Sequence, residues 1–245
     1  MPFELYDSIV IRFQWKLRQF AFRGLVKVSK IMSCSIITIV GISASGKSLL
    51  SETLRDIILD RQPYFSVEIL EGDLYFKDQK DIEFNQRLKT NYDHPYAMDY
   101  DLLEEHLKLL KSGISVNAPT YNFHEHTRAN ETTKIETAEL LIAPGALLLH
   151  DRINSYIDFS IFLDCSLELA LTRRVKRDCD KRGRTAEFVK AQFKRNVVPM
   201  YHKYVEPARN SANVVAQGEQ DISCLANQII KVLISHQLLP LSEKK

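Results

Sequence analysis

The stretch Val40–Leu50 reads VGISASGKSLL and decides the fold. Its residues Gly41–Ser48 match the phosphate-binding loop pattern G-x-x-x-x-G-K-S at every defined position. A β-branched run, Ser35–Val40, precedes the loop, and apolar residues at helical spacing follow it to about Asp60. Strand, loop and helix therefore come in the order that this loop requires.

The chemistry of the loop follows from its residue types. Two glycines allow successive backbone N–H groups to turn inward around an anion, and the helix N-terminus adds partial positive charge. Lys47 is expected to reach the β- and γ-phosphates, and the Ser48 hydroxyl to ligate Mg²⁺. We predict that the chain binds ATP or GTP with Mg²⁺. The predicted nucleotide-binding residues are Gly41, Ile42, Ser43, Ala44, Ser45, Gly46, Lys47, Ser48 and Leu49.

The rest of the chain alternates strand and helix patterns, which predicts an α/β fold of the P-loop NTPase type. We expect a doubly wound parallel sheet with helices on both faces. Ligands of such sheets bind beyond the carboxyl ends of the strands. The predicted strands are 66–70, 139–143, 159–164 and 212–216, and the predicted helices are 100–112, 167–178 and 225–234.

Composition excludes several classes of protein. The 245 residues are 45% hydrophobic with a net charge of +2, so nothing favours a nucleic-acid partner. Four scattered cysteines form no C-x-x-C pair, which favours free thiols in the cytoplasm over a zinc site. No apolar run is long enough to predict a transmembrane segment. Residues 1–31 form a basic extension, interpreted as a membrane-surface or targeting helix, as a packing appendage, or as an extension upstream of a core domain at 32–245.

Two aspartates are candidate site residues. Asp73, in EGDLYFKD, ends a predicted strand and could act as a base toward an attacking hydroxyl or hold the metal through water, unless it is a surface turn residue. Asp93, in NYDHPYAMDYDLL, suits the two hydroxyls of a ribose. The alternative role for Asp93 is helix capping, which Asp99 or Asp101 could also supply.

The stretch PTYNFHEHTR, residues 119–128, places Tyr121 and Phe123 two positions apart, on the same side of an extended backbone. With His126 they could form a slot for a flat base; the alternative is an aromatic pair in a core hairpin. The segment 167–195 is rich in Arg and Lys, which suits the charge of a transferring phosphoryl group and suggests a closing lid. A solvated basic face is the alternative.

Taken in order, the motifs GISASGKS, GDLYF, NYDHP, PTYNFHEHTR and TRRVKRDCDKRGRT resemble the uridine kinase (uridine–cytidine kinase) family over about residues 35–230. The resemblance implies phosphorylation of the 5′-hydroxyl of uridine or cytidine, and an acceptor-binding insertion at about 90–130. It also implies a homo-oligomer. The implied catalytic residues are Asp73, Lys47, Arg177 and Arg182, the implied metal residues Ser48 and Asp73, and the implied nucleoside contacts Asp93, Tyr121, Phe123, His126, Arg174, Arg184 and Gln192.

Pro144 departs from the family pattern, which has glutamate before glycine at this strand end. Asp73 is then expected to be the only carboxylate near the metal, and turnover to be slow. Phe76, Asn122 and Asn213 depart from the pattern as well. Two other functions stay open, namely a related sugar or vitamin kinase of the phosphoribulokinase type and a non-catalytic nucleotide-binding regulator.

Overall fold

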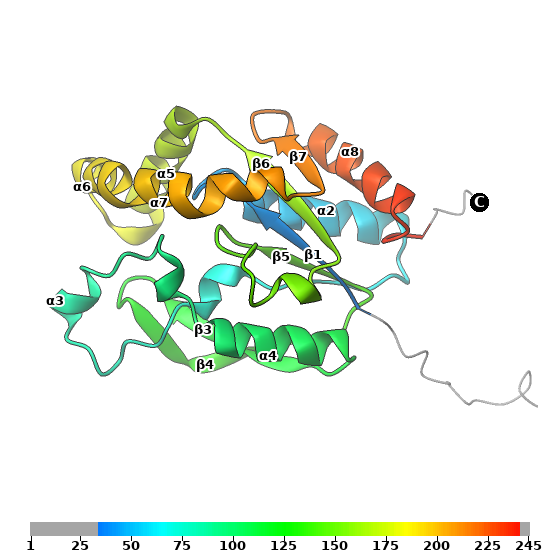
Figure 1. Ribbon diagram of the computed structural model, residues 1–245, viewed down its shortest axis with the longest axis horizontal. Coiled ribbons are helices and arrows are strands. Elements are labelled where there is room, and N and C mark those ends of the chain that lie inside the picture. Colours follow the sequence, from blue (N-terminus) through cyan, green and yellow to red (C-terminus); the bar gives the residue numbers. More distant parts are fainter. Residues whose placement is uncertain (1–33, 241–245) are drawn as a thin grey trace, which may run out of the picture. The chain divides into compact units, whose positions relative to one another are not determined.

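A five-stranded parallel sheet crosses the computed structural model, which describes residues 34–240 (Figure 1). The predicted extension, residues 1–31, lies outside these described residues. The strands lie in the spatial order β2-β5-β1-β6-β7, so chain neighbours are separated in the sheet by crossovers. Their bounds are Ser35–Val40 (β1), Val67–Ile69 (β2), Leu140–Pro144 (β5), Phe159–Asp164 (β6) and Val214–Gln217 (β7).

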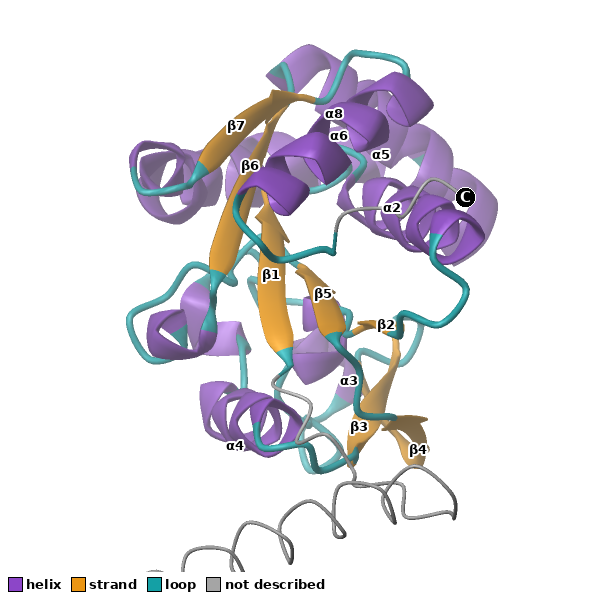
Figure 2. Ribbon diagram, turned by 90° about the vertical axis from the view of Figure 1, so that its right-hand side faces the viewer, coloured by secondary structure: helices purple, strands orange, loops and turns teal. Residues whose placement is uncertain are grey.

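Apolar residues on both sides of β1 explain why helices cover both faces of the sheet. Ile37 and Ile39 join the cluster that packs against α2 (Lys47–Arg61) and α8 (Ile222–Ser235). Ile36 and Val40 join the cluster on the opposite face, with residues of α4 (Tyr100–Lys111) and α5 (Leu167–Arg182). Figure 2 shows helices on either side of the sheet. The predicted doubly wound α/β fold is confirmed.

Capping residues set the ends of two helices. The Asp99 side chain accepts a hydrogen bond from the Leu102 N–H at 3.1 Å and caps α4. Helix α5 runs four residues beyond its predicted end at Asp178 and stops before Gly183. Gly183 has a φ of 61°, the left-handed conformation that commonly ends a helix. The shorter helices are α3 (Phe84–Arg87), α6 (Ala186–Gln192) and α7 (Val198–Met200).

An antiparallel hairpin, which the sequence suggested only as the alternative role for Tyr121 and Phe123, forms a second sheet. It pairs β3 (Val116–Asn122) with β4 (Thr127–Ile135), and its register shifts between Pro119 and Tyr121. Most residues of β4 are polar, and residues 130–134 are exposed. The strand therefore lacks the apolar pattern by which buried strands are recognised.

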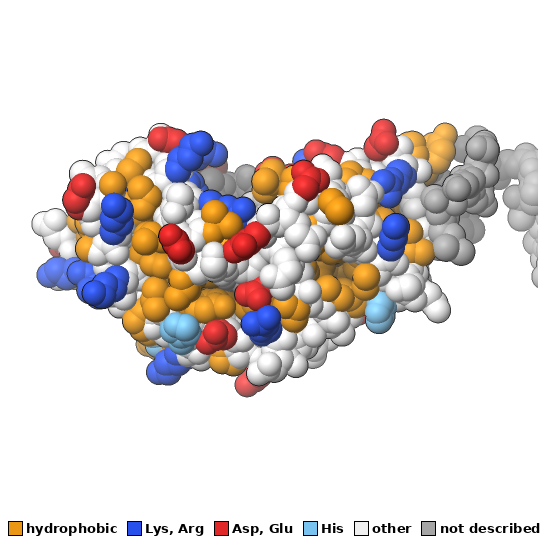
Figure 3. Space-filling view, turned by 90° about the horizontal axis from the view of Figure 1, so that it is seen from above, with side chains coloured by type: hydrophobic (Ala, Val, Ile, Leu, Met, Phe, Trp, Pro, Cys, Tyr) orange, Lys and Arg blue, Asp and Glu red, His pale blue; other side chains and the backbone are white. Residues whose placement is uncertain are grey.

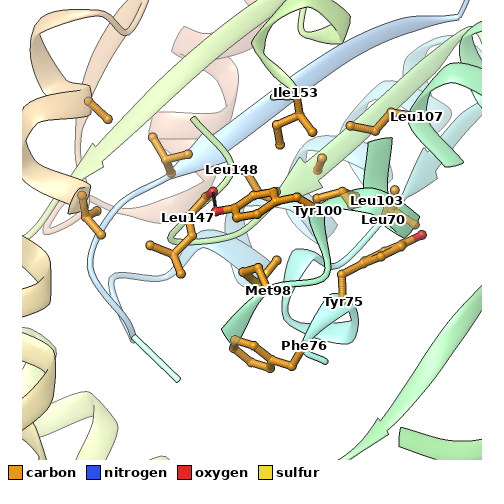
Figure 4. Packing of buried hydrophobic residues seen from close by; sticks show 14 of the residues in the cluster. Leu70, Tyr75, Phe76, Met98, Tyr100, Leu103, Leu107, Leu147, Leu148 and Ile153 are labelled. Atoms are coloured by element: carbon orange, nitrogen blue, oxygen red, sulfur yellow. Dashed lines mark hydrogen bonds between the residues drawn. The ribbon is translucent and has the colours of Figure 1, made fainter. Parts of the chain in front are cut away.

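Figure 4 shows part of the apolar cluster that contains Ile36 and Val40, around Tyr100 and Leu148. The buried Tyr100 hydroxyl donates to the Leu147 carbonyl at 2.9 Å and ties α4 to the segment after β5. The side chain of Leu148 packs against two buried glycines. A Cβ added to Gly72 would lie 2.9 Å from Leu148 Cδ1, and one added to Gly145 would lie 2.7 Å from Leu148 Cγ. The segments that follow β2 and β5 therefore meet around one leucine.

Surface and composition agree with an ordinary globular protein. None of the helices between residues 34 and 240 has the length and apolarity that crossing a bilayer requires. The four cysteines are free thiols. On the face shown in Figure 3, several Lys and Arg side chains gather at the left end, where α5 and α6 lie.

Candidate active site

A cavity of about 320 Å³ lies at the carboxyl ends of β1, β2 and β5. That volume is in the range of small-molecule sites. Of the predicted site residues, all but Gly41 and Ser45 line it. The strand ends, the acceptor segment and the arginine-rich helix therefore meet around one cavity, as the sequence predicted.

The phosphate loop has the backbone that its glycines predict. Gly41 and Gly46 have φ values of 151° and 109°, and Ala44 between them has a φ of 67°. A Cβ at Gly41 would lie 2.4 Å from the Leu163 carbonyl oxygen, so no other residue fits there. The side chain of Ser45 is buried. The Ser45 carbonyl accepts a hydrogen bond from Arg173 at 2.9 Å.

Lys47 is folded back onto the loop that carries it. Its ammonium group donates to the carbonyls of Gly41 at 3.1 Å and Ile42 at 2.9 Å. Burial, opposed by Asp73 and reinforced by Arg177, lowers the pKa of Lys47 to about 8. A lysine held by carbonyls at the mouth of a nest of N–H groups is placed to exchange those acceptors for phosphate oxygens.

A second carboxylate accompanies Asp73. Ser48 Oγ donates to Glu71 Oε2 at 3.3 Å, and Glu71, Asp73 and Ser48 all line the cavity. Burial and the neighbouring Asp73 raise the pKa of Glu71 to about 7. The expectation that Asp73 would be the only carboxylate near the metal is therefore wrong. It failed because Glu71, two residues earlier at the same strand end, turns toward the loop serine.

The residues at this point fit Mg²⁺. The ion prefers oxygen ligands, keeps several waters and is held by one or two carboxylates together with substrate phosphates. Ser48, Glu71 and Asp73 supply oxygen donors of that kind. No group of three His, Cys, Asp or Glu side chains within residues 34–240 is close enough to hold a metal alone, so phosphate oxygens and water would complete the shell. Pro144 lines the cavity but offers no side-chain oxygen.

Asp93 faces the cavity and does not cap a helix, a role that Asp99 fills. Its carboxylate lies 3.7 Å from Arg174, and its side chain is 19% exposed. Burial raises the pKa of Asp93, while Arg174 opposes the shift. Arg174 also donates to Ser43 of the loop at 2.9 Å, so the loop and the acceptor segment share one guanidinium group.

The aromatic residues form a cluster that lines the cavity and also packs within the hairpin. Tyr121 is 5% exposed and packs edge-to-face on Phe76, Tyr92 and Phe123, as a core hairpin residue would. Its hydroxyl nevertheless has no hydrogen-bond partner among the described residues, and the side chain lines the cavity. A buried hydroxyl without a partner is costly unless a ligand satisfies it.

His126 closes the same end of the cavity. It has a φ of 56°, and its Nε2 lies 3.4 Å from Arg184 Nη2. Burial, with Arg184 and Arg182 nearby, lowers the pKa of His126 to about 4. The ring is therefore neutral at physiological pH and able to accept a hydrogen bond. Gln192, which is also buried, accepts from Arg174 at 3.1 Å and from Arg184 at 3.5 Å.

The arginine-rich segment is not a solvated basic face. Arg174 is only 6% exposed, and burial lowers the pKa of Arg182 to about 10. Four guanidinium groups surround the buried carboxylate of Asp178 and line the cavity. They belong to Arg174, Arg177, Arg182 and Arg184.

Comparison with known proteins identifies the family. The model of the phosphoribulokinase / uridine kinase family matches residues 36–223. The chain belongs to this family. It is 43% identical over 183 residues to a uridine kinase of Escherichia coli (strain K12), covering 74% of this chain and 86% of that protein. It is 41% identical over 187 residues to a uridine kinase of Erwinia tasmaniensis, covering 76% and 88%.

Solved structures support the fold. A structure named provisionally as a fructose transport system kinase, from Silicibacter sp. TM1040, is 21% identical with a TM-score of 0.63 and covers 82% of this chain and 97% of that chain. One named as a possible uridine kinase, from Bacillus stearothermophilus, is 17% identical with a TM-score of 0.54 and covers 87% and 99%. Both structures share the overall fold described above.

Proposed function

We propose that this protein transfers the γ-phosphate of ATP or GTP to the 5′-hydroxyl of a pyrimidine ribonucleoside. The proposal rests on one observation: the phosphate loop lines the same cavity as Tyr121, Phe123 and His126, which would form a slot for the base. Relatives named uridine kinase support the same acceptor. A bare sugar would leave the slot without a flat partner, which argues against a sugar kinase.

In this proposal the cavity holds the two substrates at opposite ends. The loop N–H groups and Lys47 bind the phosphates, and Asp93 accepts hydrogen bonds from the ribose hydroxyls. Neutral His126 and the Tyr121 hydroxyl bind the edge of the base. Segments at about 90–130 and 167–195 then act as acceptor insertion and lid.

Asp73 takes the proton of the attacking hydroxyl. Its side chain lines the cavity, and its charge acts on both Lys47 and Asp93, which supports this role. The acceptor oxygen forms a bond to the γ-phosphorus as the bond to the nucleoside diphosphate breaks. Arg177 and Arg182 stabilise the charge on the phosphoryl oxygens. Mg²⁺, held by Ser48, Glu71 and Asp73, would neutralise part of the same charge.

A transfer assay tests the proposal. Purified protein is incubated with Mg-ATP or Mg-GTP and a panel of pyrimidine and purine nucleosides, sugars and pantothenate, with Lys47→Ala as the blank. Phosphorylation of uridine or cytidine at least tenfold above every other acceptor is expected. Preferred transfer to a sugar, or tight nucleotide binding without any transfer, would contradict the proposal.

A further inference from the structure

Asp178 is the most buried charged group in the described part of the chain, with no exposed surface, and it is not one of the predicted site residues. It lies in α5, and its carboxylate is the common partner of four arginines. Such a carboxylate is costly to bury unless several cations and hydrogen bonds compensate it. The contacts are 2.8 Å to Arg177, 3.4 Å to Arg184, 3.6 Å to Arg182 and 3.7 Å to Arg174.

The two oxygens of this carboxylate divide the arginines into pairs. Oδ1 faces Arg177 and Arg182, which we assign to the phosphates. Oδ2 faces Arg174 and Arg184, which we assign to the nucleoside. One side chain therefore contacts cations that serve both substrates.

The other contacts of the arginines extend into both halves of the cavity. Arg174 donates to Ser43 in the phosphate loop and to Gln192. Arg184 lies beside His126, and Arg182 covers the ring of Phe123 at 4.4 Å. Because one negative charge faces four positive ones, the cluster keeps a net positive charge that attracts an anionic substrate.

The backbone of Asp178 fixes the same group of residues. Its carbonyl accepts hydrogen bonds from the N–H groups of Gly183 and Arg184, at the turn that ends α5. The position of Arg184 therefore depends on Asp178 through backbone and side chain together. Three of the arginines lie on α5 itself and the fourth follows this turn.

We propose that Asp178 is a positioning residue that holds the four arginines in place before either substrate binds, so that phosphate and nucleoside are gripped in a fixed mutual geometry. Asp178 touches neither substrate. It acts by preventing guanidinium groups of like charge from moving apart into solvent. Cations fixed in advance cost no reorganisation when charge develops during transfer.

The first test is Asp178→Asn, which keeps the shape and one oxygen but removes the negative charge. We expect kcat to fall at least tenfold and the nucleoside KM to rise at least threefold. The Kd for ADP should stay within threefold, because the net positive charge near the phosphates does not decrease. A parallel loss of kcat, ADP binding and thermal stability would indicate a merely structural role. The exposed Asp180→Asn, on the same helix, is the matched control.

The second test uses the wild-type protein, so it does not depend on whether a variant folds. In ligand-free wild type labelled with ¹⁵N-arginine, the Nε–H of Arg177, which donates to Asp178 at 2.8 Å, should exchange with water at least tenfold more slowly than that of Arg55. Arg55 donates through the same atom to the next residue, Asp56, at 3.1 Å on the exposed surface of α2. Equal exchange rates would overturn the proposal.

The inference rests on the proposed roles of the arginines, and the two tests separate its failure from theirs. If wild type transfers phosphate to no acceptor, the proposed function fails, while the exchange measurement still decides whether the arginines are held in place. If transfer is normal and Asp178→Asn retains kcat within twofold, the proposed function stands and the positioning role is wrong.

Discussion

Ser48 and Glu71 form a hydrogen bond of 3.3 Å between the first turn of α2 and the end of β2. The contact joins the loop hydroxyl proposed to ligate Mg²⁺ with a carboxylate that local sequence patterns did not single out. The sheet order explains it, because β2 and β1 are separated only by β5, so their carboxyl ends lie close together.

Glu71→Gln tests whether this carboxylate serves the metal. Removing the charge should raise the Mg²⁺ concentration needed for half-maximal activity by about 10–100-fold, the usual cost of losing an outer partner of a metal site. Mn²⁺ binding to the ADP complex, followed by electron paramagnetic resonance, should weaken in parallel. The exposed neighbour Glu52→Gln is the control, and equal effects of the two variants would show that Glu71 has no specific role.

Pro144→Glu tests whether Glu71 already serves the metal in place of a glutamate at the end of β5. In the wild-type background we expect less than a threefold change in Mg²⁺ requirement, because one carboxylate already faces Ser48. In the Glu71→Gln background the same substitution should recover at least part of the loss, since β5 lies between β2 and β1. The measurement is a Mg²⁺ titration of all four proteins at saturating nucleoside. Failure to recover would place residue 144 too far from the metal.

Lys47→Ala should reduce transfer to below about a thousandth of the wild-type rate, because the ammonium group that neutralises the β- and γ-phosphates is lost. Loss of its two hydrogen bonds to carbonyls should cost only about 1–2 kcal/mol of unfolding free energy. Lys231→Ala, on an exposed face of α8, is the control for both measurements. Transfer within tenfold of wild type would refute the assignment of the phosphate loop.

Tyr121→Phe removes a buried hydroxyl that has no partner within the described residues. If the hydroxyl binds the base, the nucleoside KM should rise about fivefold, equivalent to about 1 kcal/mol for one hydrogen bond, with the KM for ATP unchanged. The free protein should become no less stable, because a buried unsatisfied group has been removed. The fully exposed Tyr64→Phe is the control, and a Tyr121→Phe variant with unchanged nucleoside KM would make the ring a core residue only.

The lowered pKa of His126 predicts a pH dependence of stability. The pKa of His126 is about 4 in the folded protein, against 6.5 for an unperturbed histidine. The neutral imidazole therefore stabilises the fold above pH 6.5, and this contribution is lost as the pH falls toward 4. The unfolding free energy of wild type should therefore drop over this interval relative to His126→Gln. Titration of the imidazole C–H signals by NMR, assigned with that variant, gives the value directly. A midpoint near 6.5 would contradict it.

Local patterns predicted the parts of the fold that depend on local chemistry. The phosphate loop, the strand Phe159–Asp164 and the start of α5 lie where the glycines, the apolar run and the helical pattern predicted them. The hairpin β3–β4 was only an alternative for Tyr121 and Phe123, because most of β4 is polar and becomes a strand through pairing with Tyr121 and its neighbours. Pairing partners distant in sequence leave no local signal.

The sequence identified those candidate site residues whose side-chain type by itself suggests a role. Tyr121, His126 and the arginines were found because aromatic, imidazole and guanidinium groups are recognisable in the sequence. Glu71 and Asp178 were missed, since an acidic residue beside a strand end or within a basic helix is usually solvated. Their importance comes from burial and from the groups around them, which only the packed structure specifies.

The contact of Leu148 with Gly72 and Gly145 limits which substitutions this part of the chain can accept. Each glycine adjoins a residue at the mouth of the cavity, Glu71 and Asp73 flanking one and Pro144 preceding the other. A single methyl group at either glycine would meet Leu148 at 3.0 Å or less and push one strand end away from the other. Mutations at these glycines can thus shift the acidic end of the site through the backbone, and residue 148 sets how large a change each glycine position tolerates.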